Sequence, residues 1–323
     1  MRFLYGCLII VFTFMILLGG GGSYIFLELQ KSGPLRQGKN IVITKGSGAG
    51  TIAQNLESEG VIASAFYFRL QYLLQQQPDL IAGEYIFTPN ITLAEVISKM
   101  AHGDIVKRKI TVAEGRTSAE IVQLLNAEKT LTGTIATIPA EGTLLPNTYQ
   151  IVLGDDRNQK IKEMQKDMQE TVMEIWAMRE ADNPLKSPQE LVILASIIEK
   201  ETGVPSERAR IAGVFYNRLA RNMMLQTDPT VVYGITRGLK PLGRSLTMDD
   251  LRTPTPYNTY SMVGLPPGPI ANPGKASIMA AARPEKNDFI FFVANGSGGH
   301  AFAVTLAEHE KNVAVWRKLN SNK

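Results

Sequence analysis

The hydrophobic pattern of the chain begins with a long apolar segment. Residues Phe3 to Leu27 include no charged side chain. As a helix rising about 1.5 Å per residue, this segment exceeds the roughly 30 Å of bilayer hydrocarbon. The pattern predicts a transmembrane anchor over residues 1–28. A signal peptide cleaved near the small residues Gly19 to Ser23 is the alternative, but the apolar run continues past them and favours the anchor.

The charges that flank this segment do not decide its orientation. Arg2 precedes it, whereas Lys31, Arg36 and Lys39 follow it. Long downstream domains are translocated largely regardless of such charges, and the layout is similar to that of a signal sequence. We therefore expect a single-pass protein with a cytoplasmic N-terminus, a linker over residues 29–39, and the remaining chain outside the cytoplasm.

Short strand and helix patterns alternate over residues 40–104 and predict a small mixed module. Strands are expected at residues 40–44 and 83–87, and helices at 51–56, 63–77 and 93–101. The turn Gly46 to Gly50 lies between a strand and a helix, as a dinucleotide-binding loop does. Because Thr51 stands where the third glycine of G-x-G-x-x-G belongs, an ordinary strand-to-helix turn is favoured.

The pattern changes after Val106 and predicts a larger domain over residues 105–323. Ser187-Pro-Gln-Glu190 suits a helix start, with a capping serine, proline at the first position and a glutamate that completes a capping box. Helices and strands follow each other without a βαβ rhythm, which indicates the α+β class. Helices are expected at residues 118–125, 160–182, 188–202, 205–221 and from 307, and strands at 107–112, 289–293 and 300–304.

Composition and missing motifs exclude several kinds of protein. The net charge of +4 is modest and no run of five like charges occurs, so a nucleic-acid arm is not supported. The single cysteine, Cys7, lies in the apolar segment, which leaves no thiol nucleophile in the rest of the chain. No H-E-x-x-H, S-x-x-K or Walker A sequence is present, and Asn295 to Gly299 lacks the first glycine of G-x-S-x-G. Carboxylate chemistry without a metal or cofactor remains for an enzyme.

Two glutamates follow a helix that is apolar on nearly every face, Leu191 to Ile198. Glu199 lies in the last turn, where the helix dipole and partial burial both favour the protonated carboxyl that a general acid needs. Glu201 lies about 200° further around the helix, so both side chains do not point into one cleft. The alternative is that both glutamates are solvated at a frayed helix end and pair with Arg208 or Arg210.

Polar loops further along the chain offer candidate binding residues. Gln226-Thr-Asp-Pro-Thr230 places an amide and a carboxylate together, although Asp228 could instead cap a helix that starts at Pro229. In Tyr257-Asn-Thr-Tyr260, two aromatic rings flank an amide, which suits sugar stacking, although such loops often only pack. Gly264-Leu-Pro-Pro-Gly268 is a stiff turn that suits the wall of a groove.

Several blocks together resemble the endolytic murein transglycosylase family, also called MltG or YceG-like. The resemblance runs in order over residues 106–318, and the anchor and the 40–104 module fit it as well. Asn147 departs from it, because we expect aspartate there. The blocks are Glu141-Gly-Thr-Leu-Leu-Pro-Asn-Thr-Tyr149, Leu194-Ala-Ser-Ile-Ile-Glu-Lys-Glu-Thr202, Val214-Phe-Tyr-Asn-Arg-Leu219, Leu225-Gln-Thr-Asp-Pro-Thr-Val-Val-Tyr-Gly234, Tyr257-Asn-Thr-Tyr260, Gly264-Leu-Pro-Pro-Gly-Pro-Ile270, Asn272-Pro-Gly274 and Gly298-Gly-His300.

The resemblance implies a function and a set of site residues. It implies a bacterial inner-membrane enzyme whose periplasmic part cuts nascent, uncrosslinked glycan between MurNAc and GlcNAc, leaves 1,6-anhydroMurNAc ends and so terminates elongation. It also implies Glu199 as the catalytic residue, a LysM-like glycan-binding module at 40–104, and peptidoglycan synthases (penicillin-binding proteins) as partners. Side chains in the matched blocks are then expected to bind substrate, namely Glu141, Asn217, Gln226, Asp228, Tyr257, Asn258, Tyr260 and His300.

Two other functions remain open at the level of the sequence. One is a peptidoglycan hydrolase in which Glu199 works with a second carboxylate, Glu141 or Asp228, because hydrolysis of a glycosidic bond normally uses two. The other is a glycan-binding scaffold that tethers wall synthases without catalysis.

Overall fold

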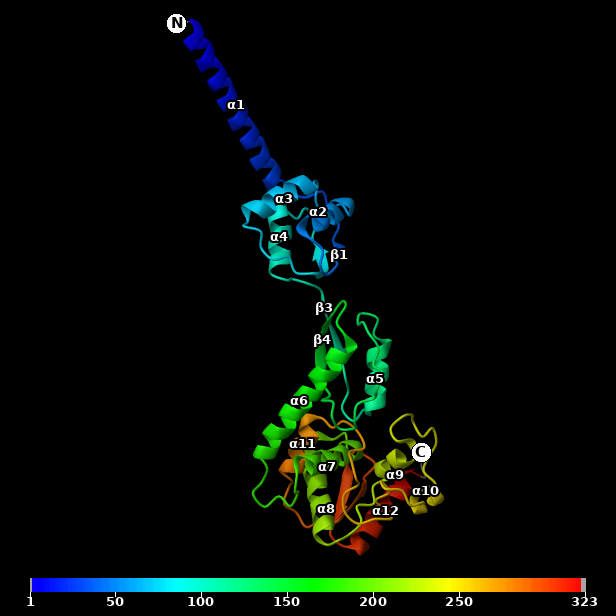
Figure 1. The fold of residues 1–323 in the computed structure, drawn as a ribbon. Coiled ribbons are helices and arrows are strands. Elements are labelled where there is room, and N and C mark those ends of the chain that lie inside the picture. The colour runs from blue at the N-terminus through cyan, green and yellow to red at the C-terminus, as the bar shows by residue number, and fades with distance from the viewer. Residues whose placement is uncertain (1, 321–323) are drawn as a thin grey trace. The chain divides into compact units, whose positions relative to one another are not determined.

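The computed structural model of this protein describes residues 2–320 and is followed from end to end in Figure 1. The chain divides into two compact units. Unit 1 comprises residues 1–108 with 150–154, and unit 2 comprises residues 109–149 with 155–323. Within the described residues the strands form three separate two-stranded sheets among many helices. This arrangement confirms the α+β class.

Helix α1 spans Arg2–Gln30. Most side chains of residues 3–18, on which the anchor prediction rests, lie outside the described residues. Near the end of α1, Tyr24, Phe26 and Leu27 are 59–60% exposed. Over the part of the chain that the structure describes, no helix combines the length and the apolar character needed to cross a membrane.

The core of unit 1 forms between one antiparallel strand pair and three helices. Strands β1 (Lys39–Ile43) and β2 (Gly83–Phe87) lie at the predicted positions within one residue, and Ile41 is opposite Tyr85. Helices α2 (Ala49–Ser58), α3 (Ala65–Leu74) and α4 (Leu93–Ala101) complete the unit. Helix α4 starts with a full capping box between Thr92 and Glu95. The largest buried side chains include Phe68, Tyr85, Phe87 and Met100.

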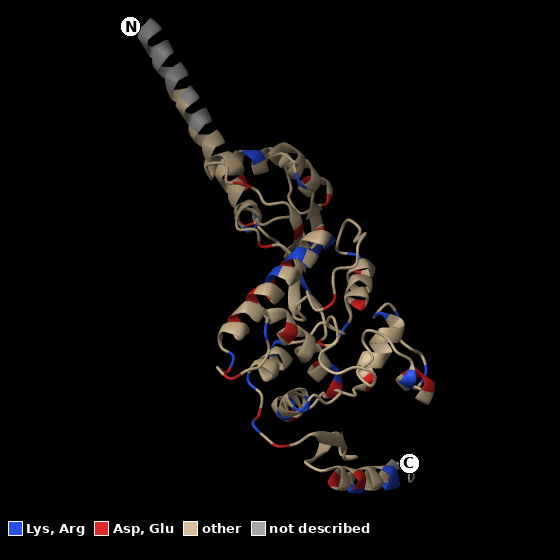
Figure 2. Ribbon diagram, turned by 60° about the horizontal axis from the view of Figure 1, so that its bottom comes forward, with Lys and Arg blue, Asp and Glu red and all other residues tan. Residues whose placement is uncertain are grey.

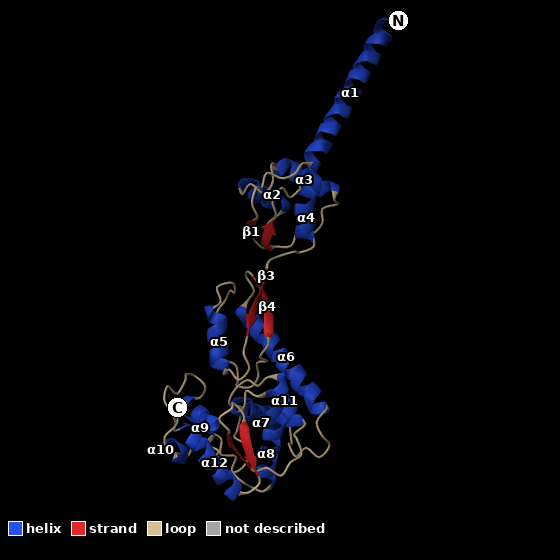
Figure 3. Ribbon diagram, turned by 180° about the vertical axis from the view of Figure 1, so that it is seen from behind, coloured by secondary structure: helices blue, strands red, loops and turns tan. Residues whose placement is uncertain are grey.

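The second strand pair joins β3 (Lys107–Thr111) to β4 (Thr148–Val152), and the boundary between the units falls within these two strands. Unit 2 continues with α5 (Ser118–Ala127), α6 (Arg157–Ala177), α7 (Pro188–Glu201), a 3₁₀ turn (Pro205–Glu207), α8 (Arg208–Ala220), α9 (Asp228–Thr236), α10 (Met248–Arg252), α11 (Lys275–Ala282), β5 (Phe291–Ala294), β6 (His300–Ala303) and α12 (Leu306–Asn320). Strand β5 pairs antiparallel with β6, and Figure 3 shows this pair beside α8.

Helix α7 is the central element of unit 2, and this explains its apolar sequence. It packs against α6, α8, α9 and α11, so all eight residues from Leu191 to Ile198 are buried, as the sequence predicts. Helix α6 instead lies at the surface. It buries one face that includes Met164, Met168 and Ile175, and its other faces carry the acidic and basic residues seen along it in Figure 2.

The start of α7 differs in one detail from the predicted capping box. Ser187 occupies the N-cap and accepts a hydrogen bond from the Glu190 amide at 3.2 Å, and Pro188 is the first helical residue. The Glu190 carboxylate, however, accepts from the Lys186 amide at 2.7 Å, not from the Ser187 amide. The capping box prediction was therefore wrong in its second half, because the glutamate reaches one residue further back.

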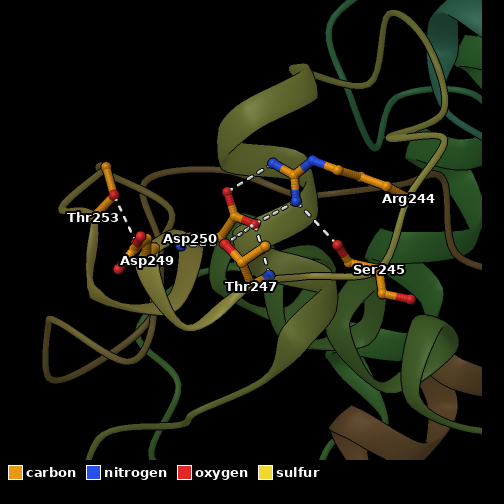
Figure 4. Close-up of polar contacts among 6 residues, drawn as sticks. All are labelled: Arg244, Ser245, Thr247, Asp249, Asp250 and Thr253. Atoms are coloured by element: carbon orange, nitrogen blue, oxygen red, sulfur yellow. Dashed lines mark hydrogen bonds and ion pairs between the residues drawn. The ribbon is translucent and has the colours of Figure 1, made fainter.

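Strand β4 and helices α10 and α11 were not predicted, and α9 was foreseen only in the alternative in which Asp228 caps a helix. Helix α10 has five residues and depends on local hydrogen bonds (Figure 4). Thr247 and Asp250 form a full capping box, and the Arg244 guanidinium donates to both oxygens of the same carboxylate. These bonds, led by the one from Arg244, hold the pKa of Asp250 well below its ordinary value.

Candidate active site

The last turn of α7 presents its two glutamates to different surroundings. The Glu199 side chain is 6% exposed. Its Oε2 accepts the Gly274 amide at 3.0 Å, and its Oε1 lies 3.8 Å from Nη2 of Arg208. Glu199 is therefore a buried, paired carboxylate. Of the two arginine partners that the sequence offered, Arg208 is present here, whereas Arg210 binds Glu285 at 2.8 Å.

A second carboxylate, that of Glu114, joins Glu199 at Arg208. Oε2 of Glu114 lies 3.5 Å from the same Arg208 Nη2. Burial, and then the negative charge of Glu199, raise the pKa of Glu114, while Arg208 lowers it. Glu114 also lies against Gly274, where a Cβ would come 1.9 Å from Glu114 Oε1 and would displace that side chain. The arrangement is that of two acids that share one cation.

Glu201 faces a pocket of about 580 Å³ and is only partly buried. Three predicted binding residues line the same pocket, Gln226, Asp228 and Tyr260. Burial, and then the negative charge of Asp228, raise the pKa of Glu201 to about 7. A carboxyl with this pKa is substantially protonated near neutral pH and can both donate and accept a proton, which are the properties of a general acid–base group.

The position of Asp228 is fixed by a tyrosine from a distant loop. The Tyr260 hydroxyl donates to Oδ1 of Asp228 at 2.7 Å, and burial followed by this bond raises the pKa of Tyr260 well above its ordinary value. Asp228 does not cap the helix at Pro229, because α9 begins at Asp228 itself and Thr227 occupies the N-cap. The capping alternative was therefore wrong, and the carboxylate remains available to the pocket.

Arg218, like Glu201, lies at this site but was not among the site residues that the sequence reasoning selected. It is 8% exposed and lines the pocket. Its guanidinium donates to the carbonyls of Ile290 and Leu225 at 2.7 and 2.9 Å and to Oε1 of Gln226 at 3.3 Å. Arg218 therefore holds the loop before α9 in place, and Gln226 adopts a positive φ of 51° there. In the sequence, the one indication that Arg218 belongs to the site is its position within the Val214 to Leu219 block.

Asn258 and Tyr257 lie in the predicted aromatic loop but do not line the Glu201 pocket. Asn258 is fully buried and donates to the carbonyls of Leu251 and Thr253, and its own Oδ1 accepts the Tyr260 amide at 2.9 Å. It therefore shapes the turn that carries Tyr260. The Tyr257 ring packs against Tyr233 with centroids 4.8 Å apart.

Three more predicted binding residues lie outside this pocket and make bonds within the fold. Oε1 of Glu141 accepts from the Ser118 amide at 2.7 Å and from Nδ2 of Asn272 at 2.9 Å. Asn217 donates to the carbonyls of Asn287 and Phe289. Nδ1 of His300 lies 2.8 Å from Oε2 of Glu207. In unit 2 these bonds connect segments that are far apart in sequence.

Comparisons with known proteins agree with the motifs. The profile of the YceG-like family matches residues 41–315. A Bacillus subtilis (strain 168) protein named endolytic murein transglycosylase is 32% identical over 84% of this chain and 83% of its own length. A protein of the same name from Streptococcus pneumoniae serotype 2 is 27% identical, over 95% of this chain and 65% of its own length.

A solved structure extends the agreement to the fold. The crystal structure of a yceG-like protein from Listeria monocytogenes matches 85% of this chain and 99% of its own chain, with a TM-score of 0.53 and 32% sequence identity. The family profile covers most of the sequence, and the Bacillus subtilis relative matches it over most of both chains. This chain belongs to the YceG-like family.

Proposed function

We propose that this protein is an endolytic murein transglycosylase whose acid–base group is Glu201. Membership of the YceG-like family and relatives that carry this enzyme name support the activity. The observation that supports the residue is the pocket in which Glu201, with a pKa raised to about 7, meets Asp228, Tyr260 and Gln226.

The reaction requires one group that first donates and then accepts a proton. Protonated Glu201 donates its proton to the glycosidic oxygen between MurNAc and GlcNAc as the bond from that oxygen to the anomeric carbon breaks. The C6 hydroxyl of the same MurNAc attacks the anomeric carbon, and the Glu201 carboxylate accepts the hydroxyl proton. The product is a 1,6-anhydroMurNAc end, no water is consumed, and Glu201 is protonated again.

Asp228 has a separate role in this proposal. Its negative charge helps to keep Glu201 protonated before the first step. The same charge favours the positive charge that develops on the sugar ring as the bond breaks. Tyr260, by donating to Asp228 at 2.7 Å, fixes the direction of that carboxylate.

Glu199, the residue that the sequence and the resemblance select, remains the competing candidate. Against it stand its bond to the Gly274 amide at 3.0 Å and its ion pair with Arg208, which engage its two carboxylate oxygens, whereas Glu201 lines the pocket with Asp228. Glu199 then serves to join α7 to Glu114 and Gly274, directly beside the turn that carries Glu201. The two assignments are separated by the variants described at the end of the Discussion.

The test of the activity itself is mass spectrometry of uncrosslinked glycan digested by the purified protein. We expect internal cleavage products that end in 1,6-anhydroMurNAc. Reducing ends would instead support the hydrolase, for which the Glu201 and Asp228 pair offers two carboxylates in one pocket. Binding without any cleavage would support the non-catalytic scaffold.

Location and partners complete the proposal. We propose that residues 1–28 anchor the chain once in the inner membrane, with the N-terminus in the cytoplasm and residues 29–323 in the periplasm. We also propose that residues 40–104 form a LysM-like module that guides glycan, that residues 105–323 form the catalytic domain, and that peptidoglycan synthases are partners. If a synthase co-purifies with the detergent-extracted full chain after crosslinking, the partnership with synthases is supported. If no synthase co-purifies, the partnership is contradicted.

A further inference from the structure

We propose that the C-terminal helix α12 forms a sugar-binding wall of the Glu201 pocket, and that Trp316 is its stacking platform. This inference rests on the proposed function, because it identifies how the glycan is held beside the acid. Neither the motifs nor the expected binding residues included this helix.

Helix α12 turns one face toward the pocket. Leu306, His309, Val313 and Trp316 all line it. Their spacing of three, four and three residues places them along one side of a helix. The helix packs against β5 and β6, and β5 contributes Phe291, Phe292 and Val293 to the same pocket. Acidic and basic residues are visible on the rest of α12, next to the C-terminal label in Figure 2.

The two walls of the pocket differ in chemistry. The wall from α7 and α9 carries the ionisable groups, Glu201 and Asp228, together with Gln226 and Tyr260. The wall from α12 and β5 is mainly apolar and aromatic, with His309 and Arg317 as its polar members. Carbohydrate sites combine these two features, because hydroxyls need polar partners while the C–H face of a pyranose ring packs against an aromatic ring. Trp316 is partly buried, so part of its indole is open to such a ring.

His309 adds a polar group to the aromatic wall. Its ring stacks on Phe291 with centroids 5.0 Å apart. Its Nδ1 is buried and has no hydrogen-bond partner among the residues that the structure describes. Burial, and then the charge of Arg218, lower the pKa of His309. A neutral imidazole nitrogen of this kind can bond to a sugar hydroxyl in either direction.

The chain offers a clean optical test because it has two tryptophans, Trp316 and Trp176. Trp176 lies on α6 with the Arg179 guanidinium 4.0 Å from its ring centroid, and it is not among the residues that line the Glu201 pocket. Trp176→Phe therefore leaves Trp316 as the single fluorophore, and Trp316→Phe leaves Trp176 as the matched control.

The experiment titrates both single-tryptophan variants of the full chain, each also carrying Glu201→Gln, with uncrosslinked glycan. We expect a saturable change in emission from Trp316 and none from Trp176. Calorimetry of the same samples measures binding independently. Binding without any change in Trp316 emission overturns the inference, and so does an equal change in Trp176 emission.

The second measurement is the cleavage kinetics of Trp316 variants that retain Glu201. We expect Trp316→Leu to lower kcat/KM about two- to tenfold, chiefly through KM, which is the size of an aromatic stacking contribution. Trp316→Tyr should recover most of the lost kcat/KM, because tyrosine keeps an aromatic ring. If the role of Trp316 were merely structural, an aromatic ring would not restore kcat/KM. Unchanged kcat/KM in Trp316→Leu overturns the inference. A parent chain that binds glycan through Trp316 but never cleaves it contradicts the proposed function instead.

Discussion

In the proposed mechanism, Glu201 and Asp228 set the pH range in which this site acts. Burial and the Asp228 charge raise the pKa of Glu201 from its ordinary 4.5 to about 7. The first step needs the protonated carboxyl, so the cleavage rate should fall as the pH rises through about 7.

The stability of the fold should change with pH in the same direction as the cleavage rate. A carboxyl whose pKa is raised in the folded state stabilises the fold below its unfolded pKa, and this contribution is lost as the pH rises through about 7.

Replacing Asp228 by asparagine tests this coupling. Asp228→Asn removes the negative charge but keeps an acceptor for Tyr260, so the pKa of Glu201 should fall. We expect the high-pH limb of the kcat/KM profile to move to lower pH, with a lower rate at pH 7. Tyr260→Phe is the matched control, because it keeps the Asp228 charge. An unshifted limb in Asp228→Asn would show that Asp228 does not influence the acid.

The sequence predicts part of this site. It places both glutamates at the end of one buried helix, turns them in different directions, and selects Gln226, Asp228 and Tyr260, which the fold brings together with Glu201. It does not show which glutamate faces the pocket. Arg208, one of the two arginines that the sequence offered as partners, pairs with Glu199. The other partner is the amide of Gly274, 75 residues further along the chain, and spacing along the chain carries no information about a partner so distant.

Helix α7 also fixes the stiff turn that follows the aromatic loop. Ser196 is fully buried in α7, and its hydroxyl oxygen accepts the Ile270 amide at 3.0 Å while donating to the Ile193 carbonyl at 2.7 Å. Ser196→Ala would leave the Ile270 amide buried without a partner, so we expect a loss of about 1–3 kcal/mol in the free energy of unfolding.

Ser277 in α11 supplies the matched control for this prediction. It is also fully buried, but its hydroxyl has no hydrogen-bond partner among the described residues. Ser277→Ala should therefore be neutral or slightly stabilising, and urea unfolding of the two variants beside the parent gives the comparison. Equal losses in both variants would contradict the role assigned to the Ser196 bond.

At the level of elements, periodicity predicts the long amphipathic and buried helices well. It fails where an element depends on local bonds or distant partners. Helix α10 has five residues, too few for a periodic pattern, and is held by the Thr247 and Asp250 box with Arg244. Strand β4 pairs with β3 although 36 residues separate Thr111, the last residue of β3, from Thr148, the first of β4. Helix α11 follows a glycine N-cap without a side-chain cap bond.

For the whole molecule, the proposal that residues 1–28 anchor the chain in the membrane gives a prediction about location. The apolar run from Phe3 to Leu27 motivates it, and exposed Phe26 and Leu27 provide apolar surface at the end of α1. We expect the full chain in the membrane fraction, a chain without residues 2–28 in the soluble fraction, and a reporter fused after Lys323 active only outside the cytoplasm. A reporter active in the cytoplasm, or a mature N-terminus near Ser23, would contradict this topology.

The most direct measurement of the central claim is the release of anhydro-ended fragments from uncrosslinked glycan by Glu201→Gln and Glu199→Gln beside the parent. Both changes keep size and hydrogen-bonding capacity, and circular dichroism checks that each variant folds. We expect Glu201→Gln to lose about 10²–10⁴-fold in rate. Glu199→Gln should keep cleaving, because it loses only the ion pair with Arg208. Near-parental cleavage by Glu201→Gln, with the loss confined to Glu199→Gln, would contradict the account and assign the reaction to Glu199.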